Sequence, residues 1–219
     1  MNKQFLNNLI KKSDLDNDIQ KENNNIKKDN INNIDFELEK YPTFKNYIVL
    51  DFETTGLSCD KDKIIEIGAI KVKNNIIVDK FETLINPNIS ISPYISNIVN
   101  ITNDMVCDKP HIEDIFKDFV YFLEDFNLVI HNAKFDMSFL IANGNRLGFN
   151  IKNKAFDTIR ATKELYPDFK KYNLASLCKH FNIKNENAHR AMSDVLATYE
   201  LYKILYDKYN KKQISLFDL

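Results

Sequence analysis

The sequence predicts an α/β protein in which a mixed, five-stranded sheet lies between two layers of helices. Strand-length apolar runs rich in β-branched residues occur alongside segments whose apolar residues are spaced three and four apart. The strands first form a hairpin and then alternate with helices, which is the order of a three-layer α/β/α fold. The expected strands are 47–53, 63–72, 76–87, 128–131 and 155–157. The expected helices are 93–99, 111–125, 134–147, 158–165, 174–181 and 190–209.

Size and composition restrict the class of protein. A chain of 219 residues is long enough for one large domain and an appendage, and 44% hydrophobic with 28% charged residues is ordinary for a soluble globular protein. A net charge of −1 excludes a global basic field, so any nucleic-acid binding must be local or assisted by a metal. The cysteines Cys59, Cys107 and Cys178 have no paired spacing, which argues against a zinc site or a disulfide framework.

Three regions are expected along the chain. Residues 1–40 are rich in Asn, Lys and Asp and can bury little, which predicts a disordered or weakly helical arm. The alternative is a short amphipathic helix over Leu6, Leu9 and Ile10 that docks on a partner. A folded domain at 41–209 and a tail at 210–219 follow. Because the chain has no bilayer-length apolar run and no secretory signal, we expect a cytoplasmic protein without a membrane partner.

The first expected strand carries the pattern that suggests chemistry. Its side chains alternate between faces, so Asp51 and Glu53 point the same way. Two neighbouring carboxylates in a core strand are unfavourable, because each loses hydration and repels the other. A divalent cation reverses that cost, and oxygen ligands suit Mg²⁺ or Mn²⁺. The alternative is a strand that exits to solvent with two hydrated carboxylates.

The sequence also predicts where two of these elements end. Asn74 and Asn75 both tolerate positive φ and separate the second and third strands, which predicts an antiparallel hairpin. Gly148 is expected to end the helix at 134–147.

Two more acids come from helices. Asn132 can cap the helix that follows the fourth strand, and Asp136 lies in its first turn, where the helix dipole favours negative charge. An exposed first-turn acid is the alternative, but Asp136 borders the apolar stripe of this helix and can join Asp51 and Glu53. In the last helix, Asp194 likewise borders the core stripe.

His189 precedes that helix and is too far round it to share the face of Asp194. We expect it in the preceding loop, able to reach over the site, with an ordinary surface histidine as the alternative.

Three segments together resemble the exonuclease motifs of the DEDDh family in order and spacing: 51–56 (Asp-Phe-Glu-Thr-Thr-Gly), 131–136 (His-Asn-Ala-Lys-Phe-Asp) and 189–194 (His-Arg-Ala-Met-Ser-Asp). From about Tyr47 to Leu205 the chain is similar to the epsilon-type proofreading exonuclease of bacterial DNA polymerase III. One departure is Asn100, where the family often has glycine. The resemblance implies a ribonuclease H-like fold, four metal-binding acids (Asp51, Glu53, Asp136 and Asp194) and His189 as general base.

The residue types also suit this reaction by themselves. Phosphodiester hydrolysis builds negative charge, and four carboxylates suffice to hold two divalent cations that stabilise the attacking and leaving oxygens. His189, with an ordinary pKa of about 6.5, can accept a proton from metal-bound water near neutral pH.

Substrate contacts are expected next to the acids. A 3′-terminal nucleotide needs a backbone cradle and a stacking surface. The backbone N–H groups of Thr54, Thr55 and Gly56 offer the cradle, the resemblance implies that Leu57 wedges against the terminal base, and Asn132 is a further candidate.

Two other polar residues border this region. We expect Asp157 to cap the helix at 158–165 rather than to be a fifth ligand. His131 either borders the site or is a packed strand-end histidine.

The tail contains a possible partner motif. Residues 213–217 (Gln-Ile-Ser-Leu-Phe) resemble the peptide by which bacterial replication and repair proteins bind the sliding clamp, with Gln213, Leu216 and Phe217 entering a hydrophobic pocket. The alternative is an apolar tail that folds back on the core.

These observations predict a metal-dependent 3′–5′ exonuclease that releases nucleoside monophosphates from single-stranded or frayed DNA 3′ ends in proofreading or repair. A DNA polymerase and the sliding clamp are the expected partners. Trimming of RNA or oligoribonucleotides by the same site is one alternative. A catalytically idle nucleic-acid- or clamp-binding module is the other.

Overall fold

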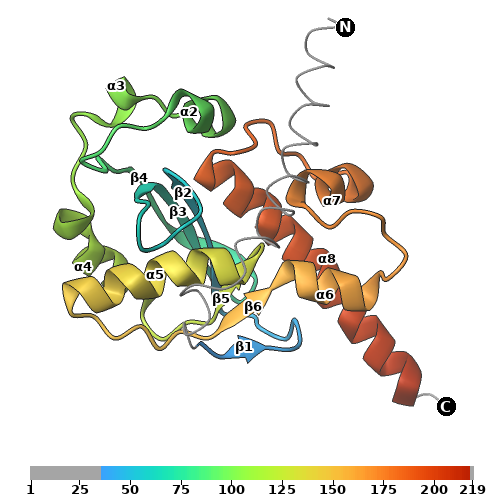
Figure 1. Cartoon of the computed structure of the whole chain (residues 1–219). Helices are drawn as coiled ribbons and strands as arrows, with labels where there is room; N and C mark the ends of the chain where they lie inside the picture. The colour runs from blue at the N-terminus through green and yellow to red at the C-terminus, as the bar shows by residue number, and fades with distance from the viewer. Residues whose placement is uncertain (1–35, 218–219) are drawn as a thin grey trace, which may run out of the picture. The chain divides into compact units, whose positions relative to one another are not determined.

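The structure, a computed structural model, describes residues 36–217. The predicted arm lies outside the described residues as far as residue 35, as does the alternative helix over Leu6, Leu9 and Ile10. A mixed sheet lies between two groups of helices (Figure 1). Its strands are β1 (Leu38–Glu39), β2 (Tyr47–Thr54), β3 (Ile64–Lys73), β4 (Ile76–Leu84), β5 (Leu128–Ile130) and β6 (Ala155–Asp157). The helices are α2 (Pro93–Val99), α3 (Asn103–Val106), α4 (Ile112–Leu123), α5 (Ala133–Leu147), α6 (Thr158–Leu165), α7 (Leu174–Phe181) and α8 (Ala191–Phe217).

The sheet has six strands in the order β1-β6-β5-β2-β3-β4, so the prediction of a mixed sheet is confirmed and the count of five is wrong. Strands β2, β3 and β4 are antiparallel, whereas β2, β5, β6 and β1 are parallel. The additional strand, β1, has only two residues, too few to show an alternating pattern within a polar segment. It pairs Leu38 with Ala155, so β1 and not β6 forms this edge of the sheet.

Side chains of β2 alternate between two cores, as expected for a central strand. Ile48, Leu50 and Phe52 belong to a buried cluster with residues of α4 and α5. Tyr47 and Val49 belong to a second cluster with residues of α6, α7 and α8. Asp51 and Glu53 continue the second series, so both carboxylates lie on the face of the sheet that α8 covers.

Asparagines occupy the left-handed backbone conformations that join these elements. Asn74 (φ 51°) and Asn75 (φ 63°) form the turn between β3 and β4, which confirms the predicted hairpin. Asn100 ends α2 with φ 54° and ψ 34°. That conformation explains why a glycine would also suit this position, and asparagine is among the few other residues that tolerate it. Gly148, with φ 80°, ends α5 as predicted.

Helix α8 is longer than the sequence suggested. It spans 27 residues and includes the segment 210–217 that was expected to be a tail. Its buried face ends at Leu205, and one turn later Tyr209 stacks on Tyr41 with ring centroids 5.0 Å apart. Even with α8 included, none of the described helices combines the length and apolarity needed to span a bilayer.

Candidate active site

Strand β2 carries two of the predicted acids at its carboxyl end. Asp51 pairs with Gly68 of β3 and Glu53 with Glu66, after which the pairing shifts register between Glu53 and Thr54. Irregularities of this kind change the local twist of a strand and the direction of its side chains. Glu53 is buried, with 8% of its surface exposed, so this carboxylate is not the hydrated surface acid of the alternative interpretation.

Asp136 reaches the same strand from the first turn of α5. Its Oδ1 accepts the backbone N–H of Phe52 at 2.9 Å, and only 2% of the residue is exposed. The alternative of an exposed first-turn acid is therefore wrong. Burial raises the pKa of Asp136 to about 8, although the hydrogen bond from Phe52 acts in the opposite direction.

Asp136 and Asp194 lie close enough to Asp51 and Glu53 for their charges to act on both. Burial raises the pKa of Asp51 well above its usual range, and repulsion from Asp136, Asp194 and Glu53 raises it further. Burial is also the main cause that raises the pKa of Glu53, and the negative charges of Asp194, Glu66 and Asp136 raise it further. Among the described residues, the Arg190 guanidinium offsets part of this repulsion at Glu53, but it is paired with Glu66, so the four acids carry excess negative charge. Divalent cations would offset this charge, and the hard oxygen donors fit Mg²⁺ or Mn²⁺.

Asp194 and His189 approach this cluster from the start of α8. The His189 backbone N–H donates to Oδ2 of Asp194 at 3.0 Å, and Asn185 donates to Oδ1 at 2.6 Å. His189 has φ 65° and lies in the loop before α8, where the sequence placed it. One ligand atom each of Glu53, His189 and Asp194 lie within 4.8 Å of one another. The imidazole of His189 therefore lies beside two of the predicted metal-binding carboxylates.

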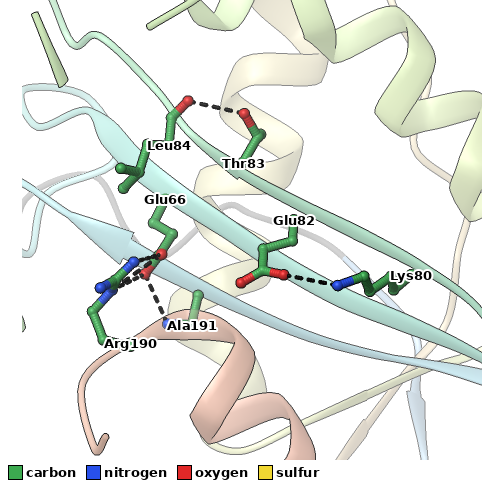
Figure 2. A network of polar contacts seen from close by, with 7 residues as sticks. All are labelled: Glu66, Lys80, Glu82, Thr83, Leu84, Arg190 and Ala191. Carbon is green, nitrogen blue, oxygen red and sulfur yellow. Dashed lines mark hydrogen bonds and ion pairs between the residues drawn. The ribbon is translucent and has the colours of Figure 1, made fainter. Parts of the chain in front are cut away.

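Glu66 and Arg190 were not predicted as site residues, yet they join β3 to the start of α8 (Figure 2). The Glu66 carboxylate is 1% exposed and accepts hydrogen bonds from the Arg190 guanidinium and the Ala191 backbone N–H. A sequence signal exists, because Glu66 is the one charged residue in the apolar run 64–70. A charge in a central strand requires a buried partner.

In the segment 54–57, which was predicted to bind the substrate, some polar groups already form hydrogen bonds within the protein. The Thr55 N–H donates to the carbonyl of Lys63 at 2.8 Å and therefore cannot contribute to the expected cradle. The Thr54 hydroxyl donates to the Gly56 carbonyl at 2.5 Å. A Cβ on Gly56 would lie 2.5 Å from the Asp62 carboxylate, so glycine permits the close fit of this turn. Leu57 is half-buried.

The prediction that Asn132 caps α5 is wrong. Asn132 adopts φ 71° and makes no side-chain cap, and the Ala133 N–H instead donates to Oδ2 of Asp157 at 3.1 Å. The other oxygen of Asp157 accepts from Ile159 at 2.8 Å and Arg160 at 3.3 Å, so this one carboxylate caps two helices. The prediction of Asp157 as a cap for α6 is confirmed. Asn132 is exposed and precedes Asp136 by four residues.

His131 is packed at the end of β5. Its Nδ1 lies 2.8 Å from the Thr158 hydroxyl, and burial lowers its pKa to about 4. It is therefore neutral at physiological pH, which favours the packed strand-end interpretation. The predicted clamp-binding residues Gln213, Leu216 and Phe217 lie on the last turns of α8, far along the chain from the acids.

Comparisons with known proteins agree with this geometry. Residues 48–202 match the family model RNase_T, described as Exonuclease. The ribonuclease H-like fold and the converging acids define the class of protein as an exonuclease, in agreement with the description of the family model. The match covers most of the chain, and the chain belongs to the exonuclease family.

Individual relatives define the family more closely. A segment of the PolC-type DNA polymerase III of Caldanaerobacter subterraneus subsp. tengcongensis is 43% identical over 162 residues, which is 74% of this chain and 12% of the polymerase. The corresponding protein of Bacillus subtilis is 44% identical over 170 residues, 76% of this chain and 12% of that protein. The chain thus spans about an eighth of the length of the polymerases it matches.

Solved structures share the fold. Exonuclease X in complex with 5′ overhanging duplex DNA is 30% identical, with a TM-score of 0.58, and the match covers 75% of this chain and 92% of that one. Escherichia coli Exonuclease I in complex with a dT13 oligonucleotide is 21% identical, with a TM-score of 0.67 over 80% of this chain and 44% of that one.

Proposed function

We propose that the protein is a metal-dependent 3′–5′ exonuclease that releases nucleoside monophosphates from DNA 3′ ends. The observation that carries the proposal is the convergence of four acids and a histidine from β2, α5 and the start of α8. The similarity to Exonuclease X, whose structure contains 5′ overhanging duplex DNA, and to PolC-type polymerases supports DNA as the substrate.

Asp51, Glu53, Asp136 and Asp194 would hold two divalent cations, Mg²⁺ or Mn²⁺. When bound, such cations lower the pKa of a water molecule and stabilise the charge that develops on the phosphoryl group. His189 would accept the proton of the attacking water as general base. Gly56 and Leu57 would orient the terminal nucleotide, and the exposed Asn132 side chain would contact its sugar or phosphate. His131, held neutral by burial, would take no part in proton transfer.

Substitution of one ligand tests the metal assignment. Asp51→Asn preserves the size of the side chain and removes its charge, so we expect hydrolysis of a 3′-labelled oligonucleotide to fall by at least about a thousandfold. Asp118→Asn, on the exposed side of α4, is the matched control and should keep wild-type activity. EDTA should stop the wild-type reaction, and Mg²⁺ or Mn²⁺ should restore it. An Asp51→Asn protein as active as wild type would refute the proposal.

The same assay separates the alternative substrates. Faster hydrolysis of single-stranded DNA than of RNA supports the DNA exonuclease, whereas preference for RNA would support 3′ trimming of RNA. Binding of DNA without hydrolysis in either metal would support an idle binding module.

We further propose a role in replication proofreading or repair, together with a DNA polymerase in the bacterial cytoplasm. The identity to PolC-type polymerases supports this context. A proofreading enzyme should remove a mismatched 3′ nucleotide from a primer faster than a matched one. Equal rates on both ends would favour a role in general degradation.

The sliding clamp remains a proposed partner through Gln213, Leu216 and Phe217. Because α8 continues through residue 217, this peptide would be presented by a helix or would unwind from it on binding. Removal of residues 213–219 should abolish binding of the full chain to a purified bacterial clamp and leave hydrolysis of short oligonucleotides intact. Unchanged clamp binding after the deletion, or none in the wild type, would refute the assignment.

A further inference from the structure

An ion pair between the buried Glu66, near the beginning of β3, and the partly exposed Arg190 joins this strand to the start of α8. Arg190 Nε lies 3.1 Å from each Glu66 oxygen, and Nη2 lies 2.6 Å from Oε1. Oε2 also accepts the Ala191 backbone N–H at 2.9 Å. Both carboxylate oxygens are thus engaged, so Glu66 is not available as a further metal ligand (Figure 2).

The contacts of Arg190 continue into the site. Its backbone carbonyl accepts the N–H of Asp194 at 3.1 Å, one turn further along α8. Asp194 Oδ2 in turn accepts the N–H of His189, the residue that directly precedes Arg190. Any movement of Arg190 would therefore displace the acid and the histidine together.

Backbone packing adds to this constraint. A Cβ placed on Gly68 would lie 2.6 Å from the Ala191 carbonyl carbon and 2.8 Å from the Met192 nitrogen. Gly68 and Glu66 are two residues apart on β3 and so face α8 together. Gly68 lets the start of α8 approach the sheet. Glu66 binds the Ala191 N–H and the Arg190 guanidinium.

We propose that Glu66 is a positioning residue of the nuclease site: through Arg190 and Ala191 it holds the start of α8 so that His189 and Asp194 remain beside Glu53. The inference rests on the proposed function. Residues that orient metal ligands typically change metal affinity or activity by about 10- to 100-fold when removed. An ion pair in which one third of the Arg190 side chain is exposed is by contrast a weak source of net stability, which argues that its role here is geometric.

The experiment compares three variants of the full chain with one control. Glu66→Ala removes both acceptors, Glu66→Gln keeps one acceptor oxygen in a side chain of the same size, and Arg190→Lys keeps the charge without the two-pronged contact. Asp79→Ala is the control: Asp79 is exposed on the neighbouring strand β4, and among the described contacts its carboxylate accepts only the Lys80 backbone N–H, at 2.8 Å.

The first readout needs neither metal nor substrate. In metal-free protein, amide hydrogen exchange of residues 189–195 should accelerate at least about tenfold in Glu66→Ala and less in Glu66→Gln, while the control matches wild type. The second readout is Mn²⁺ binding by calorimetry, which should weaken by about 10- to 100-fold in Glu66→Ala. The third is kinetics: kcat should fall while KM for an oligonucleotide stays within about threefold.

The outcomes distinguish the two proposals. If exchange at 189–195, Mn²⁺ affinity and kcat all match wild type in Glu66→Gln and Arg190→Lys, the positioning role is wrong and the ion pair serves only the fold. If wild-type protein neither binds Mn²⁺ nor hydrolyses DNA, the proposed function fails, and the exchange measurement alone still decides whether Glu66 positions this segment.

Discussion

The backbone N–H of Phe52 donates to the carboxylate of Asp136 at 2.9 Å, which ties the acid of α5 to the strand that carries Asp51 and Glu53. Phe52 lies between those two acids in sequence, and its side chain points to the opposite face of the sheet. The main chain of β2 thus fixes a third acid beside the two that it bears.

Metal-free protein should lose stability as the pH rises. The pKa of Asp136 is raised to about 8, and those of Asp51 and Glu53 are also raised, so the folded state retains protons that the unfolded chain releases above about pH 4. This stabilisation is complete below the unfolded pKa values and disappears as the pH rises through the folded ones. Relative to wild type, Asp136→Asn should gain about 3–4 kcal/mol between pH 5 and pH 8, since one pKa unit is worth about 1.4 kcal/mol.

Urea unfolding in EDTA at the two pH values measures this difference. The substitution keeps an acceptor for the Phe52 N–H, so the backbone contact is preserved. A variant that loses stability relative to wild type over this pH range would contradict the prediction.

Divalent cations should stabilise the folded protein. At a hundred times its dissociation constant a ligand adds about 2.7 kcal/mol, which corresponds to a rise in Tm of about 5–10 °C for a domain of this size. Thermal unfolding with Mn²⁺ or Mg²⁺ against EDTA measures the shift. The double variant Asp51→Asn, Asp194→Asn should show none, and an undiminished shift there would place the cations elsewhere.

Replacement of His189 should separate chemistry from folding. Its φ of 65° is tolerated well by asparagine, so His189→Asn keeps the backbone of the loop. We expect kcat to fall by about 10²- to 10⁴-fold with little change in Tm, because general base catalysis contributes about that factor. The limb of the pH–rate profile that reports this base should also disappear. Wild-type kcat in this variant would rule out the role of His189 as base.

Gly68→Ala should impair both stability and activity. The added methyl would overlap the backbone of Ala191, at a cost of about 1–3 kcal/mol and with displacement of the start of α8. Asp114→Ala serves as the comparison, since it removes the 3.0 Å contact from the His111 N–H at the start of α4 and costs about 1 kcal/mol away from the site. Chemical denaturation and kcat of both variants check this. Equal kcat values under folding conditions would contradict the predicted coupling of Gly68 to the site.

The acids were predictable because each lies in a segment with a strong local pattern. Asp51 and Glu53 follow from strand alternation, and Asp136 and Asp194 from their places beside apolar helical stripes. The pairing of Glu66 with Arg190 spans 124 residues, and no local periodicity encodes a contact of that separation. The prediction of the α5 cap failed for the same reason, because the acceptor of the Ala133 N–H is Asp157 of β6 and not the neighbouring Asn132.

Two elements escaped prediction through lack of signal. Strand β1 consists of Leu38 and Glu39 alone and exists because β6 offers it a parallel edge. The end of α8 continues past Tyr209 through Asn210, Lys211 and Lys212, which interrupt the apolar stripe, and the preceding turns extend the helix through them.

Because α8 continues through residue 217, the segment 210–217 is a rigid connection to the domain and not a flexible linker. The eight residues from 210 to 217 advance about 12 Å at the rise of an α-helix. A protein bound to residues 213–217 would be held at a fixed distance and orientation from the sheet for as long as these turns stay helical. Unfolding of these turns would turn the segment into a flexible linker, and the nuclease domain could then reach DNA 3′ ends over a wider range of positions.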